Sequence, residues 1–246
     1  MSEIVTAGMV VIGDEILSGR TKDRNIGHLA DMMTAVGIDL KEVRIVADEE
    51  QAIVEAVNAL RARYTYVFTT GGIGPTHDDI TADSIAAAFG VPCEYDAAAY
   101  RLLEEYFGSR GIEFTEARKR MARMPRGASH IPNPISVAPG FSIGNVFVMA
   151  GVPAIFQAML DNVVPTLKTG TKILSVAIPS PLPEGTIGGP LAEIQKANPE
   201  TIIGSYPKHE DGRFWTELVV RSRSEEALKA AKAAIEEMLD RLLKRE

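Results

Sequence analysis

Two adjacent carboxylates, Asp78 and Asp79, follow a glycine-rich run and could take part in phosphate or metal chemistry. The glycines of this run, residues 71–76, permit positive φ and leave the backbone open to a ligand. Thr81 can cap the helix expected over residues 82–89, and a loop that opens on a helix N-terminus offers free amide protons to an anion. A phosphate group is therefore the expected ligand. The predicted ligand-binding residues here are Gly71, Gly72, Ile73, Gly74, Pro75, Thr76 and Thr81.

The two carboxylates would repel a phosphate unless a cation lay between them. A divalent metal ion held by Asp78 and Asp79 would neutralise this charge and could activate water, as phosphoryl chemistry requires. The alternatives are a tight turn without a ligand, or one carboxylate capping the helix while the other is solvated. The loop is not a Walker A loop, because no Gly-Lys-Ser/Thr follows it. His77 beside the pair is a weak ligand candidate, because one histidine in a turn is more often exposed.

Two further acidic residues follow apolar stretches of the chain. Asp14 comes after the strand expected over residues 6–12, and Asp48 comes after the strand expected over residues 38–46. Ligands of open parallel sheets bind beyond the carboxyl ends of the strands. We therefore expect these two loops and the glycine-rich loop to open on one edge and to form a single site.

The polar residues of these loops are expected to have separate tasks. Asp14 would face the ligand, and Asn25 would hydrogen-bond one of its polar groups, although capping the helix start would use Asn25 equally well. Catalysis is predicted to depend on Asp79 together with Asp78 or Asp48. Asp48 can also serve as the N-cap of the helix that follows it.

The elements that carry these loops alternate between strand and helix. Ile53, Val57 and Leu60 fall on one face of a helix after Asp48, and residues 13–19 are expected as a loop. Such alternation predicts an α/β fold with a mostly parallel sheet.

Proline and glycine residues concentrate over residues 124–140, where the chain is too rigid and too apolar for a linker. We expect Pro139 and Gly140 to wall the ligand pocket. Residues 141–149, with a central Gly-Asn turn, predict a hairpin, and Pro153 stands at an early position of the next helix.

Residues 168–171 mark a boundary between a domain over residues 1–170 and a small α+β domain over residues 171–246. The small domain is expected to have the order β-α-β-β-α, with Trp215 and the last helix in its core. The predicted elements are strand 172–178, helix 187–197, strand 201–206, strand 213–221 and helix 225–244.

The composition of the 246 residues, 46% hydrophobic and 24% charged, is that of an ordinary globular protein. A net charge of -7 gives no support to nucleic-acid binding. The single cysteine, Cys93, excludes an intramolecular disulfide and a multi-cysteine zinc site, and it is expected to be a packed residue, not a nucleophile. Neither a secretory pattern nor an apolar stretch near the ~20 residues that span a bilayer is visible. We expect a cytoplasmic protein that does not contact membranes.

A basic cluster of residues 118–123 is expected to be a solvated helix face. Within or just after it, Arg123 or Arg126 could instead reach a substrate phosphate.

These motifs together resemble one family. The run TTGGIGP at residues 69–75 with DIT at 79–81 is similar to the TTGGTGP…D-[VL]-T signature of MoaB/Mog-type molybdopterin-binding domains. VADEE at 46–50 resembles the [VP]-x-D-[ED] segment of those proteins. The segments that narrow the match to the CinA (competence/damage-inducible protein A) family and the related domain of eukaryotic FAD synthases are GDEIL at 13–17 with Asn25, the Asp78-Asp79 pair, NP at 133–134, APGF at 138–141 and GVP at 151–153.

The resemblance implies a three-layer Mog-like domain that binds molybdopterin or a dinucleotide. In Mog-type enzymes the carboxylates matching Asp48 and Asp79 serve adenylylation of molybdopterin with Mg-ATP, whereas the CinA branch is associated with metal-dependent pyrophosphate hydrolysis of ADP-ribose or FAD-like substrates. This sequence has Ile73 where Thr is usual, and His77-Asp78 where an Arg often precedes the Asp. The extra carboxylate suits a metal, and the missing Arg weakens adenylyl transfer. The tail IGSYP at residues 203–207 resembles the small domain of the same group.

The leading hypothesis is therefore a nucleotide pyrophosphatase that uses Mg²⁺, Mn²⁺ or Co²⁺. The alternatives are a non-catalytic module that binds a pterin or a nucleotide, and a molybdopterin adenylyltransferase of molybdenum cofactor biosynthesis. The amidase domain of many CinA proteins is not part of the sequence, so nicotinamide nucleotide deamidation is not expected. A small-molecule ligand is the expected partner, and we expect a homo-oligomer.

Overall fold

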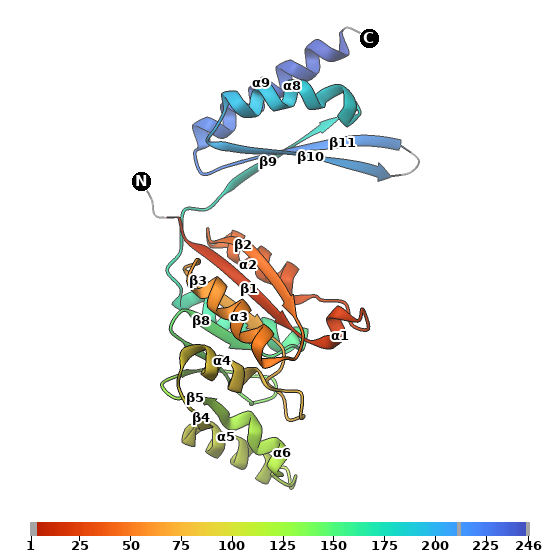
Figure 1. Ribbon diagram of the computed structural model, residues 1–246. Helices are drawn as coiled ribbons and strands as arrows, with labels where there is room; N and C mark the ends of the chain where they lie inside the picture. Colours follow the sequence, from red (N-terminus) through yellow and green to blue (C-terminus); the bar gives the residue numbers. More distant parts are fainter. Residues whose placement is uncertain (1–3, 211–212, 245–246) are drawn as a thin grey trace. The chain divides into compact units, whose positions relative to one another are not determined.

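The central strand of the larger sheet is β1 (Thr6–Ile12), an apolar run that is buried from Ala7 onward. Continuous burial of this kind is typical of a parallel strand with helices on both faces of its sheet. The computed structural model describes residues 4–210 and 213–244. The chain divides into an N-terminal unit, residues 1–170, and a C-terminal unit, residues 171–246 (Figure 1).

The N-terminal unit contains a six-stranded, mostly parallel sheet. Its order is β2 (Asp39–Val46), β1, β3 (Tyr66–Thr70), β8 (Val146–Met149), β7 (Gly140–Ile143) and β6 (Ser129–Ile131). Strands β2, β1, β3 and β8 run parallel, whereas β7 and β6 are antiparallel to their neighbours. The expected parallel sheet is confirmed, and so is the hairpin predicted over residues 141–149.

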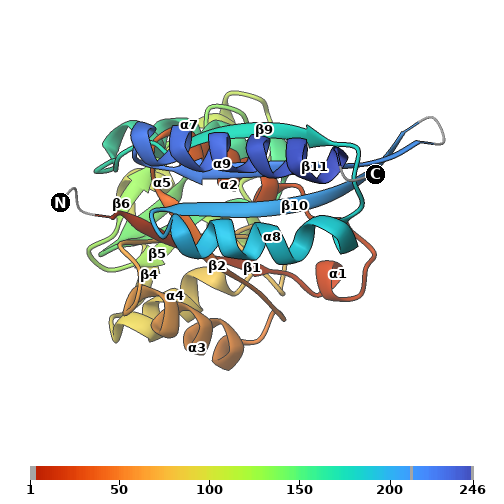
Figure 2. The same cartoon turned by 90° about the horizontal axis from the view of Figure 1, so that it is seen from above.

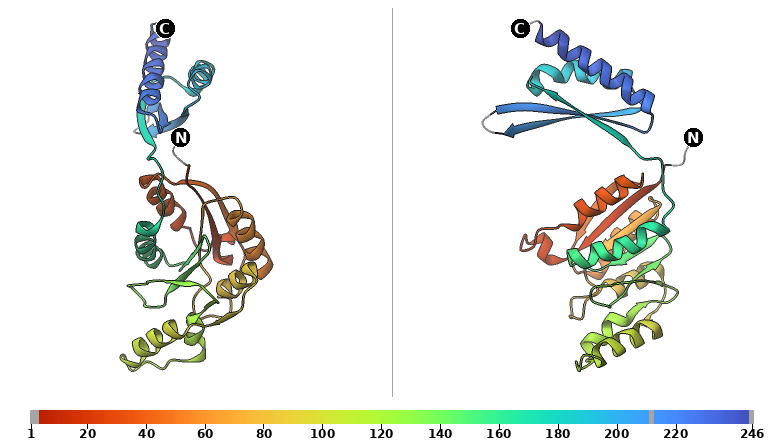
Figure 3. Two further views of the ribbon diagram at one scale, coloured as in Figure 1. Left: turned by 90° about the vertical axis from the view of Figure 1, so that its left-hand side faces the viewer. Right: turned by 180° about the vertical axis from the view of Figure 1, so that it is seen from behind.

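Helices cover both faces of this sheet (Figure 3). Ile53 of α3 and Ile85 of α4 belong to the core on one face, and Leu29 of α2 and Phe156 of α7 belong to the core on the other. The arrangement is the three-layer α/β fold that the sequence predicts. The longer helices are α2 (Asn25–Ala35), α3 (Glu50–Arg61), α4 (Thr81–Phe89), α5 (Ala97–Gly108) and α7 (Pro153–Val163).

A small sheet beside α4 and α5 pairs β4 (Cys93–Tyr95) with β5 (Arg123–Pro125). The short helical segments of the unit are α1 (Asp14–Leu17), α6 (Glu116–Lys119), η1 (Arg120–Ala122) and η2 (Val164–Thr166).

One local expectation is wrong: residues 13–19, predicted as a loop, contain the helical turn α1. The amide of Ile16 donates to the carbonyl oxygen of Gly13 at 3.1 Å, and that of Ser18 donates to Asp14 at 2.8 Å. The carboxylates of Asp14 and Glu15 lie in the first turn, where the helix dipole stabilises negative charge.

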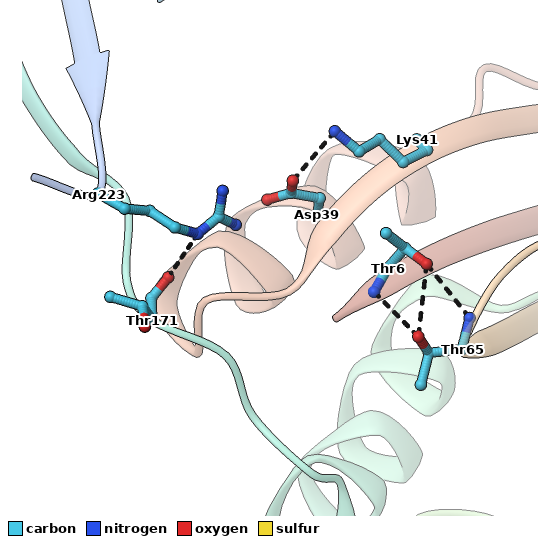
Figure 4. A network of polar contacts seen from close by, with 6 residues as sticks. All are labelled: Thr6, Asp39, Lys41, Thr65, Thr171 and Arg223. Atoms are coloured by element: carbon cyan, nitrogen blue, oxygen red, sulfur yellow. Dashed lines mark hydrogen bonds and ion pairs between the residues drawn. The ribbon is translucent and has the colours of Figure 1, made fainter. Parts of the chain in front are cut away.

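Polar contacts fix the beginning of the central strands (Figure 4). The amide of Thr6 donates to the hydroxyl of Thr65 at 3.2 Å, and the amide of Thr65 donates to the hydroxyl of Thr6 at 3.3 Å. These reciprocal bonds hold β1 in register with the turn before β3. On the neighbouring strand, Lys41 pairs with Asp39 at 3.0 Å.

The C-terminal unit is a three-stranded antiparallel sheet with two helices, α8 and α9, on one face (Figure 2). The β-α-β-β-α order predicted from the sequence is confirmed. Its elements are β9 (Leu174–Ser180), α8 (Glu184–Ala197), β10 (Thr201–Glu210), β11 (Arg213–Ser222) and α9 (Glu225–Leu243). Within the described residues, none of the helices is both long and apolar enough to cross a membrane.

Several expectations about this unit need correction. The helix α8 begins at Glu184, before residue 187, and β10 extends to Glu210, beyond residue 206. The first strand begins at Leu174 and ends at Ser180, later than residues 172–178, because its ends are set by pairing with Ser222 and Thr216 of β11. Trp215 is only half-buried and lines a cavity of about 320 Å³ outside the core.

Candidate functional site

Strands β1, β2 and β3 end at the same edge of the sheet. Ile12 pairs with Val46, and Val11 pairs with Thr70. The amide of Gly13 also donates to the carbonyl oxygen of Val46 at 3.1 Å. The loops that follow these strands therefore open together, as expected for loops at the carboxyl ends of parallel strands.

A cavity of about 510 Å³ lies at this edge. It is lined by Glu15, Thr21, residues 71–75, Asp79, Met121, Asn133, Ser136, Ala138, residues 150–153 and Ile155. The glycine-rich loop and Asp79 were predicted from the sequence. Residues 150–153 were not, but they follow β8, which is a further parallel strand ending at the same edge. The same expectation, that ligands bind beyond the carboxyl ends of parallel strands, would have found these residues if it had been applied to β8.

Glycine is required at two positions of the loop. Gly71 has φ 102°, and a Cβ there would lie 2.1 Å from the carbonyl oxygen of Ile12. Gly72 has φ 66°, and a Cβ there would lie 2.2 Å from the hydroxyl of Thr81. Gly71 therefore lies close against the end of β1, and Gly72 lies close against the start of α4.

Three consecutive amides of the loop are free to bind a ligand. Gly71 donates its amide to Met149 at 3.3 Å, and Thr76 donates its amide to the carboxylate of Asp79 at 2.8 Å. No hydrogen bond within the described part of the chain uses the amides of Gly72, Ile73 or Gly74. Successive free amides of this kind form an anion-binding concavity. Within the predicted phosphate loop, these three amides are the ones that have no partner among the described residues.

Two residues predicted to bind the ligand, Thr81 and Gly140, are buried in the structure. Thr81 is fully buried and does not cap α4; Ile80 is the N-cap, and the Thr81 hydroxyl donates to the carbonyl oxygen of Gly71 at 3.0 Å. Gly140 is buried in β7, where a Cβ would lie 2.3 Å from the carbonyl oxygen of Val148.

Asp78 and Asp79 lie in different surroundings. Asp79 lines the cavity, and its carboxylate accepts hydrogen bonds from both the amide and the hydroxyl of Thr76. Asp78 is exposed and lies near Asp48, on which its charge acts. The Thr76 hydroxyl is also the main cause that lowers the pKa of Asp78.

Asp48 is the centre of a group of carboxylates. It does not cap α3, whose N-cap is Glu49; its Oδ2 accepts the amide of Asp14 at 2.9 Å. Burial raises the pKa of Asp48, and the neighbouring negative charges of Asp14, Glu15 and Asp78 raise it further, although the Asp14 amide opposes them. Such a group would be stabilised by a cation.

The side chains fit a shared cation better than a closed metal site. In the described residues, no three His, Cys, Asp or Glu side chains are arranged to hold a metal ion by themselves. Mg²⁺ characteristically binds one or two carboxylates, with substrate phosphates completing its shell. Asp48 and Asp78 with the three free amides offer the kinds of ligand that such an ion and its phosphates would need.

Asn25 joins two of the converging loops. Its Nδ2 donates to the hydroxyl of Thr70 and to the carbonyl oxygen of Gly151, both at 2.9 Å, so it does not cap α2. Its Oδ1 is buried and accepts no hydrogen bond from the described residues. A buried acceptor beside the cavity wall is suited to a donor from a ligand or from water.

The proline-rich segment forms another wall of the cavity. Asn133 accepts the amides of Ile135 and Ser136, each at 3.1 Å, and donates to the carbonyl oxygen of Ala138 at 2.9 Å. Val137 within this turn has φ 70°, which is strained for a β-branched residue. The side chain of Asn133 therefore holds the wall in a fixed, strained shape.

A second cavity, of about 20 Å³, adjoins the first one and shares part of its lining. It is lined by residues 72–74, Asp79, Ala82, Asp83, Arg120, Met121, Arg123, Pro139 and Phe141. Pro139, predicted to wall the ligand pocket, is part of this smaller cavity.

The arginines considered as phosphate ligands are engaged elsewhere. Arg123 makes two bonds to the carboxylate of Asp83, at 2.9 and 2.6 Å. Arg126 likewise makes two bonds to Glu94, at 3.0 and 2.8 Å. Arg120, expected on the solvated face, is half-buried and lies beside the glycine-rich loop.

Known proteins match both units of the chain. Residues 8–169 match the family described as a probable molybdopterin binding domain, and residues 172–245 match the middle domain of FAD synthase. A protein of Pyrobaculum arsenaticum is 37% identical over 211 residues, covering 82% of this chain and 80% of that protein. A protein of Aeropyrum pernix is 30% identical over 257 residues, covering 97% and 94%.

Among solved structures, the protein CinA of Thermoplasma acidophilum, described as having unknown function, has a TM-score of 0.62 and 28% identity. The match covers 66% of this chain and 98% of that one. The family resemblance drawn from the glycine-rich and acidic motifs is confirmed.

Proposed function

The chain belongs to the family of probable molybdopterin binding domains and carries an FAD synthase middle domain, and from this premise we propose that it hydrolyses the phosphoanhydride of a nucleotide. The substrate class is that of ADP-ribose or FAD, and a divalent metal ion takes part. The observation that carries the proposal is the row of free amides at Gly72, Ile73 and Gly74 along a cavity of about 510 Å³.

This cavity suits a nucleotide better than an isolated phosphate ion. Its volume lies within the ~300–1,000 Å³ typical of small-molecule sites. The lining combines the backbone of residues 72–74 with apolar side chains such as Val152, Pro153 and Ile155. The amides would bind the pyrophosphate, and the apolar wall would accept a ring or a ribose.

Asp48 and Asp78 are the residues that would hold the cation, and Mg²⁺, Mn²⁺ and Co²⁺ all accept carboxylate oxygens. When bound, the ion supplies neutralisation of the phosphate charge and polarisation of a phosphoryl oxygen.

The carboxylates would also handle the proton of the attacking water. Asp48, at the centre of the acidic group, is the proposed base. Water oxygen forms the new bond to phosphorus while Asp48 accepts the water proton, and the bridging P–O bond breaks. ADP-ribose then yields AMP and ribose 5-phosphate, and the proton leaves to solvent.

One contact favours a second candidate, a binding module without turnover. The carboxylate of Asp79 is held by the amide and the hydroxyl of Thr76, so Asp79 acts through the shape of the loop. If Asp48 and Asp78 have no catalytic task, the same cavity binds a nucleotide or a pterin and releases it unchanged.

The test is incubation of the full chain with ADP-ribose or FAD and each of the three metal ions, with AMP measured by mass spectrometry. We expect AMP release that is lost on chelation and falls by at least ~100-fold in Asp48→Asn, since general-base catalysis contributes about 10²–10⁴-fold.

Asp31→Asn is the matched control, because Asp31 is an exposed aspartate on α2 away from the acidic group. Its AMP release should equal that of the unmodified chain. Tight nucleotide binding without AMP release by the folded chain would select the binding module, and full activity of Asp48→Asn would refute the assigned base.

A further inference from the structure

We propose that Arg120 is a phosphate-binding residue of this site and supplies the positive charge that the glycine-rich loop lacks. This inference rests on the proposed function in that it takes the ligand to be a pyrophosphate-containing compound. It adds a contact that neither the loop motif nor the basic cluster in the sequence assigns.

The charge around the loop requires such a residue. Asp14, Glu15, Asp48 and Asp78 form the acidic group, and Asp79 lines the cavity itself. A pyrophosphate brings further negative charge, and a cation shared with two carboxylates offsets only part of it. The residue beside Asp78 that could have helped, His77, is 98% exposed on its side chain and therefore does not contact the cavity.

Among the described residues, the smaller cavity is lined by two cations, Arg120 and Arg123, and the larger cavity by none. Arg123 has its charge matched by the two bonds to Asp83. Arg120 has no such partner: its Nη2 donates to the backbone carbonyl oxygen of Asp79 at a long 3.3 Å, and no carboxylate of the described chain pairs with it. Its charge is therefore available to a ligand.

The position of Arg120 is fixed by its neighbours. Ala122, two residues later, is fully buried, and its carbonyl oxygen accepts the amide of Asp96 at 2.9 Å. Met121, the next residue, lines both cavities and packs against the core. This anchoring fixes the backbone of Arg120, and the bond from its Nη2 to the carbonyl oxygen of Asp79 places the guanidinium beside the loop.

The two cavities share Met121, Asp79 and residues 72–74. The smaller one has too little volume for a phosphate, so the ligand phosphate would lie in the larger one, against the free amides. A guanidinium has five N–H donors. Arg120 can keep its bond to Asp79 and still present two parallel donors to phosphate oxygens, as arginine does in bidentate phosphate contacts.

The experiment measures binding of inorganic pyrophosphate to the full chain by calorimetry, with Mg²⁺ present. Arg120→Ala should bind about 10- to 100-fold more weakly, the loss expected for a hydrogen-bonded charge contact. Arg120→Lys should lose less, because it keeps the charge without the fork. Arg101 is exposed on α5, and within the described part of the chain it bonds to the carbonyl oxygen of Ala97 alone, so Arg101→Ala should bind as the unmodified chain does.

Arg120→Gln separates ligand contact from support of the loop. Its amide can still donate to Asp79 but carries no charge, so it should bind as weakly as Arg120→Ala and show a shallower salt dependence of binding. Normal binding by Arg120→Gln, normal binding by Arg120→Ala, or no pyrophosphate binding by the unmodified chain would each overturn the proposal. Should Arg120→Ala not fold, the Gln and Lys variants decide.

These outcomes are independent of turnover. Pyrophosphate binding that depends on Arg120, in a chain that releases no AMP from any nucleotide, would uphold the arginine and refute the hydrolase. AMP release by the unmodified chain, with unchanged pyrophosphate binding in Arg120→Gln, would uphold the hydrolase and refute the role of the arginine.

Discussion

Replacement of Gly71 by alanine tests how tightly the phosphate loop is pressed onto the sheet. Two costs add. The first is backbone strain, because φ is 102° at this residue; a side chain at positive φ costs about 1–2 kcal/mol. The second is steric, because the new Cβ would lie 2.1 Å from the carbonyl oxygen of Ile12, a backbone atom that cannot rotate away. Overpacking of this kind costs about 1–3 kcal/mol.

The expected loss for Gly71→Ala is therefore about 2–5 kcal/mol, or a fall in Tm of roughly 4–20 °C for a unit of this size. Gly90→Ala is the matched control. Gly90 also has positive φ, 67°, at the end of α4, but nothing lies within 4 Å of its added Cβ. It should lose only the strain, about 1–2 kcal/mol.

Urea unfolding followed by far-UV circular dichroism measures these losses. Trp215, the single tryptophan, lies in the C-terminal unit, and its fluorescence should show an unchanged transition in both variants. Equal losses in Gly71→Ala and Gly90→Ala would refute the reasoning, because the contact with Ile12 would then contribute nothing.

Two further predictions concern titrating groups. Burial and its acidic neighbours raise the pKa of Asp48, so ionised Asp48 destabilises the folded state. Asp48→Asn should therefore raise the free energy of unfolding at pH 7. This gain should vanish as the pH falls below 3.8, the ordinary pKa of an aspartate. A gain that persists at low pH would contradict this, as measured by thermal unfolding across pH. Burial, with the charge of Asp83 second, raises the pKa of the Cys93 thiol to about 12. At pH 8 iodoacetamide should therefore label the native chain at least ~100-fold more slowly than the urea-unfolded chain, with rates read by mass spectrometry, and equal rates would contradict the burial.

The strand ends could be predicted from the sequence because a strong local signal marks each of them. The apolar run over residues 6–12 and the glycines after Thr70 leave few alternatives, and parallel pairing then places Asp14, Asp48 and the glycine-rich loop on one edge. The roles within the loop could not be predicted in the same way. Thr81 has the right type for a cap, but it faces Gly71 and donates to its carbonyl oxygen, a contact set by how the loop folds back.

The roles of the arginines could not be predicted from the sequence either. Arg118, Arg120, Arg123 and Arg126 are close in sequence, and charge alone does not distinguish them. Their partners do, and these come from distant segments: Asp83 for Arg123 and the backbone of Asp79 for Arg120. Only the tertiary structure decides which arginine stays available.

The adjacent carboxylates of Asp78 and Asp79 have different surroundings in the structure. Thr76 holds the carboxylate of Asp79 against the loop, so the glycine-rich turn is closed by its own acidic residue. Asp78 is left to the group around Asp48, where negative charge accumulates unless a cation joins it. A loop whose amides attract an anion thus stands next to carboxylates that attract a cation. Under the proposed function, a phosphoanhydride with its metal ion would supply both charges in one ligand.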